Sequence, residues 1–124
     1  MTKQATDNRV ETALTQEQIN ATPKEVLEQL FLLSEDRRLA YEESENKYKN
    51  AIYRIKEVIL PRMHKELSEE TNPKYIRGYK ENIKHQMNLI DKYKSELKLI
   101  HENENTLWDN ALKMDKVLGY GLED

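Results

Sequence analysis

Apolar residues recur every seven positions through the second half of the chain. One series, with a single charged exception, contains Ile76, Ile83, Ile90, Leu97, Glu104, Ala111 and Leu118. A second series begins three residues later and contains Tyr79, Gln86, Tyr93, Ile100, Leu107 and Met114. Two interleaved series of this kind form the a/d seam of a helix that packs against another helix. The pattern therefore predicts one long α-helix over residues 73–118.

A weaker seam of the same kind runs through the first half of the chain. Its apolar members are Leu27, Phe31, Tyr41, Tyr48, Ile52, Ile55 and Ile59, and polar residues interrupt it. Pro61 falls inside this pattern, where its ring removes a backbone donor and clashes with the preceding turn. We therefore predict a long helix over residues 23–67 that is kinked near Pro61, after which Met63 and Leu67 fall off the seam.

Local start and stop signals support these helices. Thr15 and Gln18 have the spacing of a capping box at the start of a short helix. Pro23 and Pro73 each follow a residue that can cap a helix, and proline is favoured at the first helical position. Gly119 is suited to end the second long helix, because glycine readily adopts the left-handed conformation of a C-terminal cap.

Two long helices joined by a short turn over residues 68–72 must lie antiparallel as neighbours. We expect an all-α fold: a long antiparallel two-helix hairpin, coiled-coil-like, with a short N-terminal helix. Residues 1–14 are predicted to form a polar arm and residues 15–124 a single helical-hairpin domain. The register places these pairs opposite one another: Tyr48 and Tyr93, Phe31 and Ala111, Leu27 and Met114, Arg38 and Glu104.

Apolar side chains also lie beside the seam, near the end of the hairpin that carries the termini. They are Val26, Leu30 and Leu33 on the first helix and Trp108, Leu112 and Val117 on the second. Either residues 10–21 fold back as a short third helix that covers them, or a second copy or another protein docks there. We predict Leu30, Leu33, Trp108 and Leu112 as the partner-binding residues.

Composition narrows the possible classes of protein. Of the 124 residues 37% are hydrophobic and 35% charged, which suits extended helices better than a globular domain. Cysteine is absent, so disulfides and thiolate metal sites are excluded. The N-terminus lacks a signal-peptide pattern and no stretch is apolar enough to span a membrane. We expect a cytoplasmic protein, or one within a virion or assembly if it is viral, that is neither secreted nor membrane-spanning.

Candidate catalytic and metal-binding groups are sparse. The histidines are His64, His85 and His101, and none follows a glutamate by the three positions that helical di-iron sites use. Neither a nucleophile–base set nor a phosphate-binding glycine loop is recognisable. We expect no enzyme activity, no catalytic residues, no cofactor, no metal and no small-molecule substrate.

Charge is unevenly distributed along the chain. The formal net charge is −3, yet residues 47–98 carry 13 Lys and Arg against seven Asp and Glu, a net of +6. A basic stripe at helical spacing consists of Lys74, Arg77, Lys80 and Lys84. Such a stripe beside tyrosines can contact a nucleic-acid backbone, although it is also an ordinary solvated helix face.

These observations favour a non-enzymatic helical interaction protein. It would act as a structural adaptor or assembly factor through helix–helix packing, with itself as a homo-oligomer, with another protein, or with both. Its composition is compatible with a phage or mobile-element origin. One alternative is a nucleic-acid accessory protein that binds through the basic half near the turn. Another is a small inhibitor protein that uses its acidic end.

Overall fold

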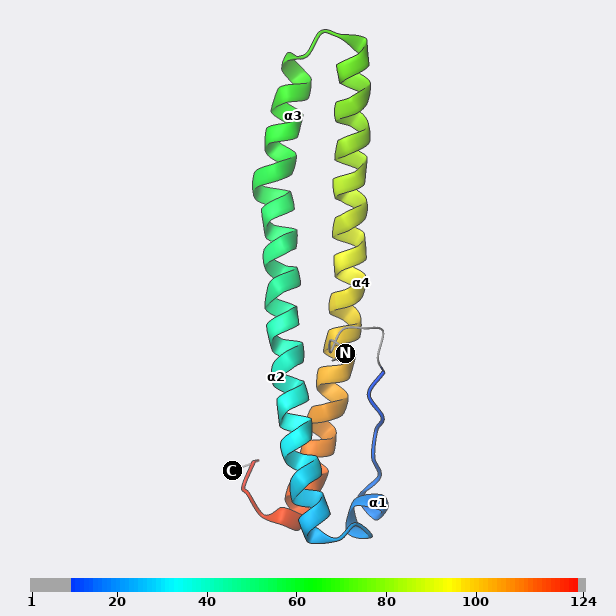
Figure 1. Cartoon of the computed structure of the whole chain (residues 1–124), viewed down its shortest axis with the longest axis vertical. Coiled ribbons are helices and arrows are strands. Elements are labelled where there is room, and N and C mark those ends of the chain that lie inside the picture. The colour runs from blue at the N-terminus through cyan, green and yellow to red at the C-terminus, as the bar shows by residue number, and fades with distance from the viewer. Residues whose placement is uncertain (1–9, 123–124) are drawn as a thin grey trace. The chain divides into compact units, whose positions relative to one another are not determined.

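Helices make up most of the described part of the chain, residues 10–122 of the computed structural model (Figure 1). The elements are α1 (Gln16–Asn20), α2 (Lys24–Arg54), the π-helical turn η1 (Ile55–Ile59), α3 (Leu60–Glu69) and α4 (Pro73–Leu118). Residues 10–122 contain no strand, which confirms the all-α prediction. The chain divides into unit 1, Met1–Glu45 with Lys98–Asp124, and unit 2, Asn46–Leu97.

The start and stop signals are found where the sequence predicts them. At α1, Thr15 and Gln18 form the reciprocal capping box. At α4, the Asn72 side chain accepts a hydrogen bond from the Lys74 amide at 3.0 Å. Gly119 has a φ of +73° and its amide donates to the Asp115 carbonyl, as in a left-handed C-terminal cap. Each helix end therefore satisfies backbone groups that would otherwise lack partners.

In unit 1, α1 and segments of α2 and α4 enclose one apolar core. Ile19, Leu27, Phe31, Ala111 and Met114 are buried together, with Leu14, Leu118 and Leu122 packed around them. The Phe31 ring meets Tyr120 edge-on, with ring centroids 5.1 Å apart. Two of the three pairs predicted in this unit, Phe31 with Ala111 and Leu27 with Met114, lie in this cluster, as the antiparallel register requires.

In unit 2, the paired segments make a thinner contact. The rings of Tyr48 and Tyr93 lie 5.3 Å apart, which confirms the predicted pairing. Ile55, Ile83 and Ile90 are buried. Both units thus show the packing of an antiparallel helical hairpin. None of the helices in the described residues has an apolar stretch long enough to cross a bilayer.

A π-helical turn just before Pro61 interrupts the first long helix. In η1 the Leu60 amide donates to the Ile55 carbonyl, five residues back, immediately before Pro61. A π-turn inserts one residue into the helix and advances the later side chains around its axis. Met63 and Leu67, which a uniform seven-residue pattern leaves off the seam, are accordingly half-buried, whereas Arg62 and Glu69 are exposed.

Candidate interaction site

An extended segment, residues 10–14, lies along α4 in unit 1 (Figure 1); we call it the strap. The Asn103 side chain accepts a hydrogen bond from the Glu11 amide, and the Asn110 side chain accepts one from the Leu14 amide, both at 2.9 Å. Asn110 also donates to the Thr12 carbonyl at 2.9 Å, and the Lys113 ammonium donates to the Leu14 carbonyl at 2.7 Å. The backbone of the strap is therefore held by side chains of α4.

The spacing of the two asparagines explains how a helix can hold an extended chain. Asn103 and Asn110 are two helical turns apart, a rise of about 10.5 Å. The three residues from Glu11 to Leu14 span about 10 Å when extended. The side chains of Asn103 and Asn110 therefore bind opposite ends of the same short segment. Both asparagines are almost fully buried, with exposures of 2% and 4%.

The side chain of Glu11 connects the strap to α2 through hydrogen bonds. Its carboxylate accepts hydrogen bonds from the Arg37 guanidinium and, at 2.7 Å, from the Tyr41 hydroxyl. The Glu11 residue is 8% exposed and Tyr41 is fully buried. Buried charges are rare unless they are paired in this way. The strap thus bridges both long helices of unit 1.

These contacts revise the prediction for the N-terminal region. The expected third helix over residues 10–21 is confined to Gln16–Asn20. The asparagine side chains satisfy the strap's backbone groups, so the strap does not need helical hydrogen bonds. Of the predicted polar arm, residues 1–9 lie outside the described residues, and residues 10–14 are this docked strap. The clue in the sequence was a pair of asparagines seven residues apart beside the seam.

A partly open cavity of about 240 Å³ lies between the strap and the two helices. Its walls include Leu30 and Leu33, two of the four predicted partner-binding residues. Trp108 and Leu112 are not part of the wall. Trp108 is 41% exposed and Leu112 is half-buried. The structure therefore brings Leu30 and Leu33 together at one cavity and leaves Trp108 and Leu112 outside it.

Arg38 lies beside Trp108, with its guanidinium carbon 5.9 Å from the ring centroid. Its guanidinium also forms two hydrogen bonds with Glu35 one turn earlier, at 2.8 and 3.3 Å. The bonding to Glu35 is the main reason that the pKa of Arg38 is raised, and the charge of Glu104 adds to that effect. Arg38 therefore bonds to Glu35, and the negative charges of Glu42 and Glu104 both favour its charged form.

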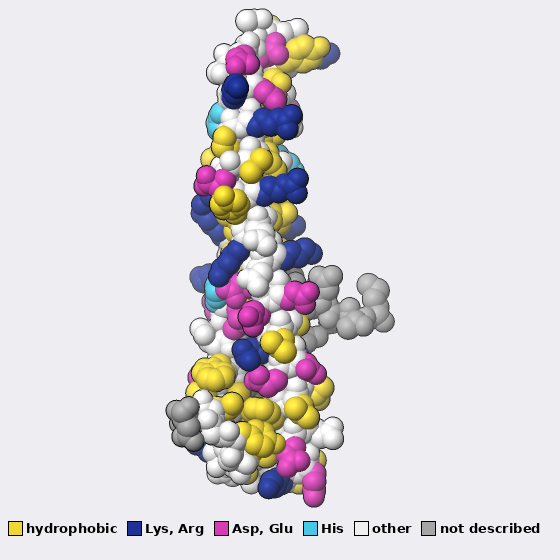
Figure 2. Space-filling view, turned by 90° about the vertical axis from the view of Figure 1, so that its left-hand side faces the viewer, with side chains coloured by type: hydrophobic (Ala, Val, Ile, Leu, Met, Phe, Trp, Pro, Cys, Tyr) yellow, Lys and Arg dark blue, Asp and Glu magenta, His cyan; other side chains and the backbone are white. Residues whose placement is uncertain are grey.

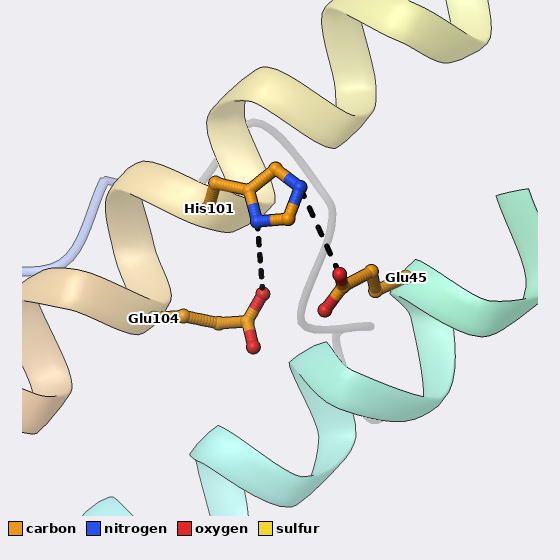
Figure 3. A group of neighbouring side chains, drawn as sticks. All are labelled: Glu45, His101 and Glu104. Carbon is orange, nitrogen blue, oxygen red and sulfur yellow. Dashed lines mark ion pairs between the residues drawn. The ribbon is translucent and has the colours of Figure 1, made fainter. Parts of the chain in front are cut away.

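His101 links carboxylates from both helices of unit 1 (Figure 3). Its Nε2 lies 3.7 Å from Glu45 on α2, and its Nδ1 lies 3.7 Å from Glu104 on α4. The three side chains offer possible metal-ligand atoms within 4.8 Å of one another. A metal ion, however, takes one nitrogen of an imidazole, and here each nitrogen faces a different carboxylate. This geometry suits an imidazole that bridges two carboxylates better than a metal centre. His101 and Glu104 are three residues apart on one helix, whereas nothing in the sequence indicates that Glu45 lies beside them.

The predicted basic stripe lies in unit 2 and is divided between two surface hollows on α4. One hollow is lined by three of the basic residues, Arg77, Lys80 and Lys84, together with Pro73, Ile76 and Glu81. Lys74 lines the other, with Tyr75 and Tyr79. Partial burial, with the nearby carboxylates of Glu66 and Glu70, raises the pKa of the Tyr79 phenol. Three of the four predicted basic residues therefore converge on one surface.

Exposed apolar side chains are concentrated along α2 in unit 1. Figure 2 shows hydrophobic side chains at this surface with carboxylates around them. The leucines involved, with their exposures, are Leu30 (39%), Leu32 (65%), Leu33 (57%) and Leu39 (55%). At about 100° per residue, Leu30 and Leu33 share one face of α2, and Leu32 and Leu39 share another. No protein-family model, no curated protein and no solved structure matches this chain.

Proposed function

We propose that the chain is a non-enzymatic helical interaction protein, a structural adaptor or assembly factor that works through helix–helix packing. Its first partner is a second copy of itself. The observation that carries this proposal is the exposed apolar surface of α2 in unit 1, where Leu30 and Leu33 line the cavity beside the strap. Burial of exposed aliphatic side chains such as these removes apolar surface from water, which favours association.

Charge favours a second copy as the partner. Unit 1 carries eight Lys and Arg against 16 Asp and Glu, a net charge of −8. Unit 2 carries 12 against seven, a net charge of +5. Complementary charges of this size steer association and set its orientation. Unit 1 of one copy therefore attracts unit 2 of another, and the apolar anchors of unit 1 supply the close contact.

The mass of the protein in solution tests this function. Light scattering over a concentration series at low salt should show a dimer or larger assembly, which dissociates more readily as added salt screens the charges. Replacing Leu33 by serine should weaken association by about tenfold or more, the effect expected of an interface anchor. Leu32→Ser is the matched control, because Leu32 is similarly exposed, at 65%, on the same helix but does not line the cavity.

Two results would count against self-assembly. A monomer at every concentration and salt would exclude it. An equal effect of Leu33→Ser and Leu32→Ser would show that the leucines at the cavity have no special part in the interface.

A second candidate function is binding of single-stranded nucleic acid through unit 2. It is favoured by the convergence of Arg77, Lys80 and Lys84 on one hollow. If these residues contact phosphates, replacing Lys80 and Lys84 together by alanine should reduce the slope of log affinity against log salt by about 1.4. The control is the double change Lys92→Ala and Lys94→Ala, which removes the same charge elsewhere on α4. Absence of binding to single-stranded DNA at low salt would refute this function.

A further inference from the structure

A surface hollow of about 320 Å³ lies in unit 2 on the helix formed by α2, η1 and α3. We call it the π-turn hollow, because its lining extends across η1. Three apolar, two basic and one acidic residue form this lining: Val58, Ile59, Met63, Arg54, Arg62 and Glu66. π-Helical turns inside α-helices are found frequently at functional sites. The hollow therefore coincides with a local irregularity that often accompanies function.

The apolar part of the π-turn hollow is incompletely covered. Val58 is 54% exposed, and Ile59 and Met63 are half-buried. Covering these three side chains would remove apolar surface from water, which favours the docking of another apolar group. Apolar cavities of about 150 Å³ already admit benzene, so the hollow has room for an aliphatic side chain. Its first requirement of a partner is therefore an exposed aliphatic surface.

The charges of the π-turn hollow add a second requirement. The Arg62 Nε lies 3.2 Å from a carboxylate oxygen of Glu66. Arg54 is exposed, and no ion pair of Arg54 is present among residues 10–122. A partner that carries a carboxylate beside its apolar side chains would therefore complement the hollow.

The exposed surface of α2 in unit 1 meets both requirements. Leu30 and Leu33 are 39% and 57% exposed and share one face of the helix. Asp36 follows Leu33 by three residues, the spacing of neighbours on a helix surface, and is exposed. An aliphatic side chain beside a carboxylate in unit 1 thus corresponds to Val58 beside Arg54 in unit 2. The net charges of −8 and +5 of the two units act in the same direction.

The two hollows of α4 match this leucine surface less well. The apolar residues of the hollow that contains the basic stripe are Pro73 and Ile76. Those of the other hollow are Tyr75 and Tyr79, whose rings carry a hydroxyl. The π-turn hollow has three apolar residues and no hydroxyl in its lining, so it offers the larger apolar contact to a leucine.

We propose that the π-turn hollow is the surface of unit 2 that receives the Leu30 and Leu33 surface of unit 1 of a second copy. The proposal rests on the self-assembly proposed above and names the other half of its interface. The contact joins two different surfaces and is therefore heterologous. Leu33 of one copy covers Val58 of the other, and Asp36 faces Arg54.

Single variants of the full chain test the hollow. Val58→Ser should raise the dissociation constant of self-association about five- to tenfold at low salt, measured by light scattering, because the apolar contact is lost. Met87→Ser is the matched control and should stay within about twofold of the wild type. Met87 is also 54% exposed in unit 2 but does not line the hollow.

Mixing two variants tests whether the leucine surface and the hollow meet each other. A Leu33→Ser chain keeps an intact hollow and a Val58→Ser chain keeps an intact leucine surface, so a mixed pair contains one unaltered contact. A contact altered on one side loses little more from a change on its other side. The mixture should therefore associate about fivefold or more tightly than either variant alone. The control mixture of Leu30→Ser and Leu33→Ser, which alter the same surface, should gain nothing.

Two results would overturn this docking surface while self-assembly stands. One is a Val58→Ser chain that associates like Met87→Ser. The other is a mixture of Leu33→Ser and Val58→Ser that associates no more tightly than the separate variants. A wild type that stays monomeric would overturn both self-assembly and the docking surface. Because the wild type is measured before any variant, the two failures are distinguishable.

Discussion

Replacing Leu27 by alanine is expected to lower the free energy of unfolding by about 2–5 kcal/mol. Leu27 is fully buried and belongs to the core cluster of unit 1 with Phe31 and Met114. Truncation removes apolar contacts and leaves a cavity that a core built from three helices cannot fully close. Urea denaturation followed by circular dichroism at the helical minimum measures the change. In a protein of this size the loss would be a large part of the total stability.

The control for this prediction is Leu32→Ala on the same helix. Leu32 is 65% exposed, and substitutions at such positions usually change stability by less than about 0.5 kcal/mol. Both changes remove the same atoms and raise helix propensity equally, so their difference isolates burial. Similar losses from Leu27→Ala and Leu32→Ala would contradict the core described for unit 1.

Removing the two strap-binding asparagines is expected to release the strap. Asn103→Ala and Asn110→Ala should each cost about 1–3 kcal/mol, because each leaves a backbone amide of the strap without its acceptor. Amide hydrogen exchange of Glu11 and Leu14 measures the release directly. In the wild type both amides should be protected, and in the double variant they should exchange at nearly the rate of an unfolded peptide.

The double variant should cost less than the sum of the two single changes. Once the strap has left α4, a second substitution has nothing further to break, so the docking free energy of the strap sets an upper limit. Asn105→Ala serves as the control, since Asn105 is exposed on the same helix. Additive losses, or amides that remain protected in the double variant, would contradict the described docking.

The parts of the fold that depend on local rules could be predicted from the sequence. The seven-residue series located α4, and the residues around Thr15, Pro73 and Gly119 located helix ends, because capping and helical periodicity act over a few residues. The register of the hairpin followed from the length of the turn. It correctly paired Tyr48 with Tyr93, whose ring centroids lie 5.3 Å apart.

The parts that depend on long-range contacts could not be predicted in the same way. The strap is stabilised by residues about 90 positions away in sequence, and an extended pentapeptide has no periodicity of its own. The carboxylate of Glu45 reaches His101 only through the pairing of α2 with α4. The π-turn at Ile55–Ile59 was not predicted, because a single inserted residue leaves no sign in the sequence except the apparent drift of Met63 and Leu67.

The docking of the strap through its backbone has a consequence for how this region can change in evolution. Asn103, Asn110 and Lys113 bind amide and carbonyl groups that every residue except proline offers, so the side chains of Thr12 and Ala13, which are exposed, are free to vary. The number of residues between Glu11 and Leu14 is not free, because three extended residues must match two helical turns. Related chains should therefore differ in the residue types at these positions but keep the same number of residues between Glu11 and Leu14.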